Sequence, residues 1–420
     1  MMPGKNKKEK KPMCQYERHD YKCNRSLYDG EYCIFHSKEI EKKKDQFDDA
    51  FWQEYETQKV NERFNFVGFV FPDRFNLKKI DLKKAFLQGI ILPGAELQEA
   101  SLNGANLQNA HLERANLQKA FLKGTNLQGA NIKCGDLREA DLRGAILQEA
   151  DLKEAKLQGA RLQDANFKGA ILREANLKGA FLLGSGIQGA NLQKADLEKA
   201  DLQGAKLRGA KLQGAKLQGT KLQGAKLPGA NLHAADLQEA SLQGADLSSA
   251  NLKSANLSHS SLEKALVKKV KFNRFTRCLG IDVTRAKGSP RFVRFAKDQE
   301  YLEEFRSSWK RYPLYIIWLM LADCGRSMLI WLFWSICMAL GFAIKFFSLG
   351  PGAFCIKQPL EHSLDTMIYY SVVTFTTLGF GDITPNTIEA SRWVMAEVIL
   401  GYIMLGGLIS IFANKLARRS

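Results

Sequence analysis

Residues 105–129 read ANLQN AHLER ANLQK AFLKG TNLQG, so a five-residue unit recurs with leucine in third place. An apolar residue holds this phase at every fifth position from Leu77 to Phe272. Amphipathic helices repeat about every 3.6 residues and strands every two, so neither keeps these leucines on one side. Only a chain that turns within each unit does so. The pattern predicts a solenoid with leucine and alanine stacked inside.

Turn residues support this interpretation. Glycine recurs two positions after the leucine, as at Gly104 and Gly129, where a tight turn favours it. The units resemble those of pentapeptide-repeat proteins. The resemblance implies a right-handed quadrilateral β-helix with four repeats per coil, on the order of 48 Å long at a strand spacing of roughly 4.8 Å. The alanine position also tolerates Thr125, Gly135, Ser185 and Thr220.

The charge of the repeats bears on their role. Some pentapeptide-repeat proteins mimic DNA, and their rods are acidic. Residues 81–260 here contain 23 Lys or Arg against 18 Asp or Glu. We therefore favour a rigid scaffold or assembly domain, with an unknown cytoplasmic partner or ligand. A basic face is predicted around Lys206, Lys211, Lys216, Lys221 and Lys226.

A small cluster of metal-ligand residues lies near the N-terminus: Cys14, Cys23, Cys33 and His36. Three thiols and an imidazole are a set that holds structural Zn²⁺ tetrahedrally, and the Cys33-x2-His36 spacing suits one knuckle. A metal would explain how so polar a segment folds. The alternative is a disordered tail with thiols by chance. The eight cysteines do not indicate a secreted disulfide framework, and the polar start of the chain does not indicate a signal peptide.

Two apolar runs, Ser327–Ile344 and Val394–Ala413, are long enough to cross a membrane. Residues 261–326 before the first run carry 15 Lys or Arg against 7 Asp or Glu, and basic residues also follow the second run. Positive flanks at both places predict two spans with both termini in the cytoplasm. The positive charge comes with no nucleic-acid-binding motif, so we expect no nucleic-acid partner.

The segment between the runs, residues 365–382, reads DTMIYYSVVTFTTLGFGD. It resembles the signature of potassium channels, with Ile368–Phe375 as a re-entrant pore helix. The resemblance implies a filter whose backbone carbonyls replace the water around K⁺, and a homotetramer in which each chain lines part of the pore. Consecutive carbonyls point one way only where alternate residues are left-handed, which Gly379 and Gly381 permit. The implied filter residues are Thr376, Thr377, Leu378, Gly379, Phe380, Gly381 and Asp382.

Other residues are candidates for supporting or gating such a pore. Tyr369 and Tyr370 stand where related channels carry aromatic residues around the filter. Glu397 lies inside the second apolar run, where a carboxyl is a functional candidate or a tie to the pore loop. A hinge and close helix packing are both open readings for Gly401, Gly406 and Gly407.

Together the patterns predict a multidomain chain: a β-helix joined to an all-α membrane domain with two transmembrane helices and a re-entrant loop. We predict that it conducts K⁺ across a prokaryotic cell membrane and is not an enzyme. The alternatives are a nonselective cation channel and a membrane-anchored interaction scaffold. The predicted parts are a zinc segment at 1–50, a connecting segment at 51–75, the β-helix at 76–272, a basic linker with an interfacial helix at 273–326, and the channel domain at 327–415.

Overall fold

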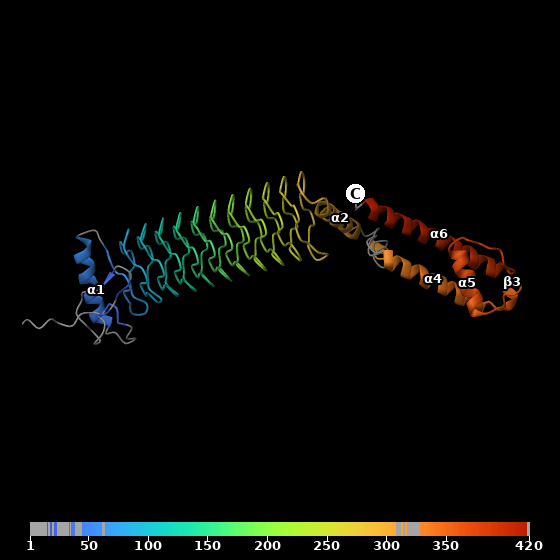
Figure 1. Ribbon diagram of the computed structural model, residues 1–420, viewed down its shortest axis with the longest axis horizontal. Coiled ribbons are helices and arrows are strands. Elements are labelled where there is room, and N and C mark those ends of the chain that lie inside the picture. Colours follow the sequence, from blue (N-terminus) through green and yellow to red (C-terminus); the bar gives the residue numbers. More distant parts are fainter. Residues whose placement is uncertain are drawn as a thin grey trace, which may run out of the picture. The chain divides into compact units, whose positions relative to one another are not determined.

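The computed structural model describes Gln15, residues 17–18, 21–22, Cys33, 35–37, 44–60, 64–307, 312–313, Ile316 and 328–417. The chain forms two compact units, Met1–Glu300 and Tyr301–Ser420. Figure 1 shows both units, and each is described by itself below. Cys14, Cys23 and most of the predicted interfacial helix lie outside the described residues.

The first unit is a rod of parallel β-bridges. Asn106 pairs with Asn126, twenty residues further on, and this spacing recurs along the rod. One coil therefore takes four five-residue repeats. Backbone hydrogen bonds run along the rod axis, as from Leu107 N to Asn126 O at 2.7 Å and from Asn126 N to Ala105 O at 2.9 Å. The solenoid predicted from the period of five is confirmed.

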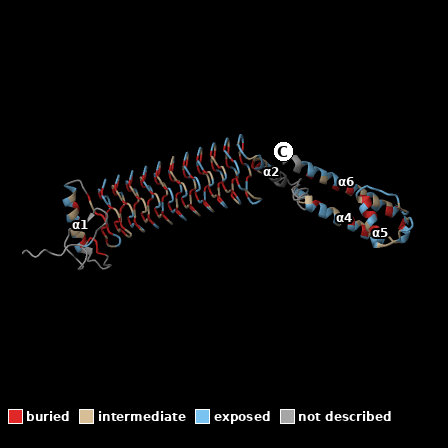
Figure 2. Cartoon of the chain, viewed as in Figure 1, coloured by how far each residue is buried: buried red, intermediate tan, exposed pale blue. Residues whose placement is uncertain are grey.

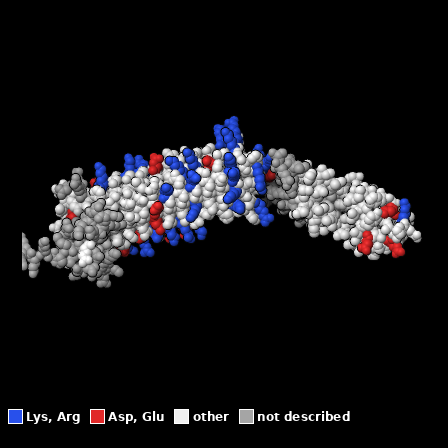
Figure 3. Space-filling model, viewed as in Figure 1, with Lys and Arg blue, Asp and Glu red and all other residues white. Residues whose placement is uncertain are grey.

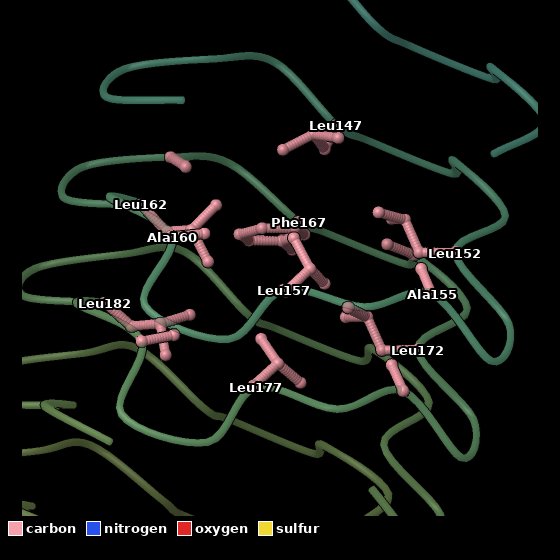
Figure 4. Packing of buried hydrophobic residues seen from close by; sticks show 14 of the residues in the cluster. Leu147, Leu152, Ala155, Leu157, Ala160, Leu162, Phe167, Leu172, Leu177 and Leu182 are labelled. Carbon is pink, nitrogen blue, oxygen red and sulfur yellow. The ribbon is translucent and has the colours of Figure 1, made fainter. Parts of the chain in front are cut away.

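The leucines and alanines of the repeats form the core. Leu107 and Ala105 are each 1% exposed, and their equivalents in the other coils are equally buried. Figure 4 shows such side chains stacked within the coils, and Figure 2 shows the buried positions recurring along the rod. Each repeat closes with a turn, in which Ala110 N donates to Leu107 O at 3.0 Å and Asn109 has a positive φ of 55°. The turn position holds many residues besides glycine, although L-residues pay about 1–2 kcal/mol for that conformation.

The bridges extend beyond the predicted bounds of 76–272. They begin with Asn65 paired to Phe86 and end with Leu266 paired to Lys287. Both of these pairs are twenty-one residues apart, because one extra residue enters the coil at each end of the rod. The extra residue near the C-terminal end shifts the phase of the apolar positions, so the five-residue rhythm in the sequence ends at Phe272 although the rod continues. Residues 64–75 of the connecting segment and the start of the basic linker therefore belong to the rod, whereas residues 51–59 lie in a helix.

Helices cover both ends of the rod. Helix α1 (Lys44–Lys59) buries Phe47 and Phe51 completely, and they pack on Phe71 and Phe75 of the first coils. Helix α2 (Pro290–Ser307) buries Phe292 against the last coil. A solenoid needs such caps because its terminal coils otherwise expose their cores. The two short strands β1 (Glu17–Arg18) and β2 (Tyr21–Lys22) pair antiparallel before α1.

The prediction of one basic face is wrong. Lys206 and Lys226 share a ladder, whereas Lys211, Lys216 and Lys221 belong to the three other ladders of the rod. Successive repeats lie on successive sides of a coil, so lysines five residues apart cannot share a side. All five are exposed and surround the rod as a collar. Figure 3 shows basic side chains spread over the visible side of the rod.

The second unit contains two long apolar helices, α4 (Met328–Ser348) and α6 (Ile388–Ala417). Residues 328–348 and 388–413 are long and apolar enough to cross a membrane. Between them come the 3₁₀ turn η1 (Pro351–Ala353), strand β3 (Phe354–Ile356), helix α5 (Leu364–Phe375) and strand β4 (Ile383–Pro385). Strands β3 and β4 pair antiparallel. Helix α5 begins after Ser363, whose hydroxyl caps it by accepting from Thr366 N at 3.1 Å.

Candidate functional site

The loop from Thr376 to Asp382 joins the C-terminal end of α5 to β4. It starts from a firm anchor, because Thr377 N donates to Thr374 O at 3.0 Å and Leu378 N to Val373 O at 2.9 Å. Its other end is held where Lys357 N donates to Asp382 O at 3.0 Å. The loop is therefore fixed at both ends by the helix and the strand pair beside it.

The backbone of the loop alternates in handedness. Gly379 and Gly381 have φ of 48° and 70°, as the sequence predicted. Thr377 has φ of 61°, which the sequence did not predict because threonine rarely adopts it. Left-handed residues at alternate positions turn successive carbonyls to the same side of the strand. Among the described residues, the carbonyls of 377–380 accept no hydrogen bond, so they remain available to a ligand.

The loop presents apolar side chains outward within one chain. Leu378 and Phe380 are 63% and 65% exposed. Tyr369 donates from its hydroxyl to Asp382 Oδ2 at 2.6 Å, which ties the loop to α5. Tyr370 packs between Phe346 and Phe354 and is 6% exposed. The two tyrosines thus differ: the first contacts the loop directly, and the second anchors α5 in the core of the unit.

Glu397 of α6 is fully buried against α5. Its carboxyl contacts the hydroxyl of Ser371, which also lies 2.6 Å from the carbonyl of Ala339 in α4. A hydroxyl has one proton to donate and a carbonyl only accepts. When Ser371 donates to Ala339, the contact with Glu397 takes its proton from the carboxyl. Ser371 links three helices in this way. Sequence patterns do not reveal this role, because one serine in an apolar helix can point in any direction.

The candidate hinge glycines differ in their surroundings. A Cβ at Gly401 would collide with the carbonyl of Phe375 at the end of α5, and one at Gly407 would collide with the ring of Trp331. Trp331 also donates from Nε1 to Met404 O at 2.7 Å. A Cβ at Gly406 would meet nothing within 4 Å. Close packing therefore accounts for Gly401 and Gly407 but gives no reason for Gly406.

Two of the four predicted zinc ligands are described. Cys33 Sγ lies 3.1 Å from His36 Nδ1, and both residues are buried. His36 Nε2 lies 3.1 Å from the carbonyl of Val67, which can only accept. The Nε2 atom therefore carries the proton and Nδ1 presents a lone pair toward the thiol. No group of three metal-ligand residues occurs in the described part of the chain.

Family models match both units. The model for pentapeptide repeats matches stretches between residues 76 and 268, and the model for an ion channel matches residues 329–418. The chain is 32% identical over 75 residues to two pore potassium channel c of Oryza sativa subsp. japonica, covering 17% of this chain and 16% of that protein. It is 34% identical over 80 residues to protein LctB of Bacillus caldotenax, covering 17% and 58%. The chain thus spans less than two thirds of either relative.

Solved structures of pentapeptide-repeat proteins are also similar. HetL from Nostoc sp. strain PCC 7120 is 33% identical, with 56% of this chain and 93% of that chain covered and a TM-score of 0.30. QnrB1 is 17% identical, with 46% and 98% covered and a TM-score of 0.36. The family matches therefore identify the chain as a pentapeptide-repeat protein that carries an ion channel domain at residues 329–418.

Proposed function

We propose that the protein is a potassium-selective channel whose filter is the loop Thr376–Asp382. The observation that carries the proposal is the alternation of left-handed residues at Thr377, Gly379 and Gly381. Along this stretch the carbonyls of 377–380 accept no hydrogen bond from any residue that the structure describes. Dehydrated K⁺ needs a shell of oxygens, and rings of such carbonyls supply it. One chain contributes one strand of carbonyls, so the pore is a homotetramer around a central axis. Thr377 adds its hydroxyl to the innermost ring.

The membrane arrangement follows from the helices and their flanks. Helices α4 and α6 cross the bilayer, and α5 with the loop enters and leaves on one side. Irregular backbone is tolerated at that depth because it lines an aqueous path. The basic flanks support a topology with both termini in the cytoplasm, and the proposed setting is the membrane of a prokaryotic cell. The repeats then form a cytoplasmic, right-handed quadrilateral β-helix, whose four ladders support the four-sided shape.

The test is K⁺ flux into liposomes containing the full chain, compared with Na⁺ flux. Gly379→Ala forces an L-residue into φ of 48° and should abolish K⁺ flux. Gly341→Ala is the matched control, because this glycine lies in α4 with nothing within 4 Å of an added Cβ. K⁺ flux above Na⁺ flux that is lost only in the first variant is the expected result. Flux that persists in Gly379→Ala would refute a filter in this loop.

A nonselective cation pore is the second candidate function. Phe380 lacks the hydroxyl that a tyrosine would offer to the residues around the filter, and this favours a looser loop. Equal K⁺ and Na⁺ flux, lost in Gly379→Ala, would support a nonselective pore.

A membrane-anchored scaffold is the third candidate function. Binding of a cytoplasmic partner to the rod, without flux in any condition that opens the pore, would favour that role.

We propose that the N-terminal segment binds structural Zn²⁺ through Cys14, Cys23, Cys33 and His36. The support is the orientation of His36, whose Nδ1 faces the Cys33 thiol while Nε2 is held by the Val67 carbonyl. Metal analysis of the purified chain should find about one zinc per chain, as expected for a four-ligand site. Cys33→Ser should remove it, and Cys134→Ser on the exposed surface of the rod should not.

A further inference from the structure

One ladder of the rod is almost free of charge over six coils. Its bridge residues are Phe86, Asn106, Asn126, Ile146, Asn166 and Gly186, joined by successive parallel bridges. Each is followed in its repeat by a buried residue and then by two turn residues. At these bridge and turn positions only Glu149 and Lys168 are charged. We call this surface the amide face, because asparagine and glutamine make up much of it.

The other ladders of the same coils are highly charged. On the ladder that contains Glu96, which we call the Glu96 ladder, Arg138 pairs with Asp136 at 2.6 Å and Lys178 with Glu198 at 2.8 Å. Ion pairs also occur on the two remaining ladders, whereas the described residues of the amide face form none. The charged bridge and turn residues of the Glu96 ladder are Glu96, Glu99, Lys119, Asp136, Arg138, Glu139, Lys156, Lys178, Asp196, Glu198 and Lys199.

The side chains of the amide face are suited to binding an identical surface on a second copy of the chain. A side-chain amide both donates and accepts hydrogen bonds, so a row of amides is complementary to an identical row. Gln108 already donates to Gln128 Oε1 at 3.3 Å in the next coil. Phe86 and Ile146 add apolar area, with 51% and 38% of their surfaces exposed. Self-complementarity is what a contact around a twofold axis requires.

We propose that two copies of this chain pair through their amide faces, with the rods parallel and coil facing coil. The net charge of +17 makes two copies repel, and the amide face is where the rods approach with least repulsion. A partner of opposite charge would instead favour the charged ladders or the lysine collar. The pairing rests on the proposed function in one respect: a multi-subunit pore holds the copies close together.

The size of the amide face explains why the pore, which holds the copies close together, matters for the pairing of the rods. Six coils at a spacing of roughly 4.8 Å are about 29 Å long, and three outward residues at roughly 3.3 Å are about 10 Å wide. The contact thus covers about 300 Å² per copy, well below the roughly 800 Å² of a standard stable interface. Paired rods are therefore stable only when another part of the chain raises their local concentration.

Crosslinking of the full chain in liposomes tests the pairing. Gln108→Cys places a thiol on the amide face. Gln118→Cys is the matched control, since this glutamine occupies the same position of a repeat in the same coil but on the Glu96 ladder. Both are made in a Cys134→Ser background, which removes an exposed thiol of the rod. A short bismaleimide should give about tenfold more covalent dimer with Gln108→Cys, as expected for a tethered pair.

A second pair of variants tests the role of neutrality. Asn126→Lys added to Gln108→Cys should reduce crosslinking to the control level, whereas Asn116→Lys on the Glu96 ladder should leave it unchanged. Equal crosslinking at the two cysteine positions, or none at Gln108→Cys, would overturn the proposal. Crosslinking that continues from dimer to tetramer would also overturn it, because an isologous contact joins only two copies. Dimers without K⁺ flux would refute the proposed function and leave the pairing intact.

Discussion

The hydroxyl of Ser371 in α5 lies against the carboxyl of Glu397 in α6, and both groups are buried. Glu397→Ala should destabilise the channel unit by about 1–3 kcal/mol, because the buried hydroxyl of Ser371 loses one of its two hydrogen-bond partners. Glu397→Gln should retain most of the stability, since an amide can still donate to the hydroxyl. Thermal unfolding in detergent measures both.

The control for this contact is Glu389→Ala at the start of α6. Its side chain is 64% exposed and pairs with Lys345 at 3.8 Å, so its loss should cost less than about 1 kcal/mol. If Glu397→Ala costs no more than this control, the buried contact does not hold α5 to α6. K⁺ flux of Glu397→Gln then shows whether the carboxyl has a further role in the pore.

Two neighbouring glycines of α6 should respond differently to alanine. Gly407→Ala should destabilise by about 1–3 kcal/mol, because the added methyl overlaps the ring of Trp331. Gly406→Ala should be neutral or stabilising by up to about 1 kcal/mol, since alanine favours a helix and the space is open. A Gly406→Ala variant of normal stability that no longer opens would instead support a hinge at that residue.

The thiol of Cys278 should be protected by the end of the rod. The residue is fully buried, and burial raises its pKa from 9.0 to about 12. At pH 8 a maleimide should label exposed Cys134 of the folded chain and leave Cys278 unlabelled. Mass spectrometry of digests identifies the labelled sites, and labelling of Cys278 at pH 8 without unfolding would contradict its burial.

The same thiol makes the stability of the folded chain depend on pH. Between about pH 9 and 12 the unfolded chain releases the proton of Cys278 while the folded chain keeps it, so the free energy of unfolding falls as pH rises.

Ile132 and Gly135 should be coupled in stability. A Cβ at Gly135 would lie 2.7 Å from Cγ2 of Ile132, so Gly135→Ala should cost about 1–3 kcal/mol. Leucine has no branch at Cβ, and the next repeat holds Leu137 with Ala140. In an Ile132→Leu background the same substitution should therefore cost much less. A double-mutant cycle on urea unfolding measures the difference, and additive effects would show that the two positions are independent.

The rod could be predicted from the sequence because each repeat makes the same contacts with the next coil. Leu107 and Ala105 are buried by their own coil and the neighbouring coils, which are only twenty residues away in the sequence. The ends could not be predicted in the same way. Phe47 and Phe292 cover the terminal coils from helices that have no five-residue period, so only their packing identifies them as caps.

The pore loop was predictable in part. Its glycines mark the left-handed positions that a short motif already indicates, whereas Thr377 adopts one of these positions only through its place in the loop. Contacts between helices were harder to predict from the sequence. Ser371 contacts Glu397, and Trp331 contacts Gly407, across separations of 26 and 76 residues that no local pattern connects.

The length of one coil sets a rule for how the rod can change. An inserted or deleted repeat of five residues moves every later repeat to the neighbouring ladder, so the last coil of the rod would be rotated relative to α1 at the first coil. A change of twenty residues alters the length and preserves the orientation. The gain or loss of a single repeat would therefore disrupt any surface built from several coils, because the later coils would present a different ladder at that surface. The gain or loss of a whole coil keeps every repeat on its own ladder and therefore preserves such a surface.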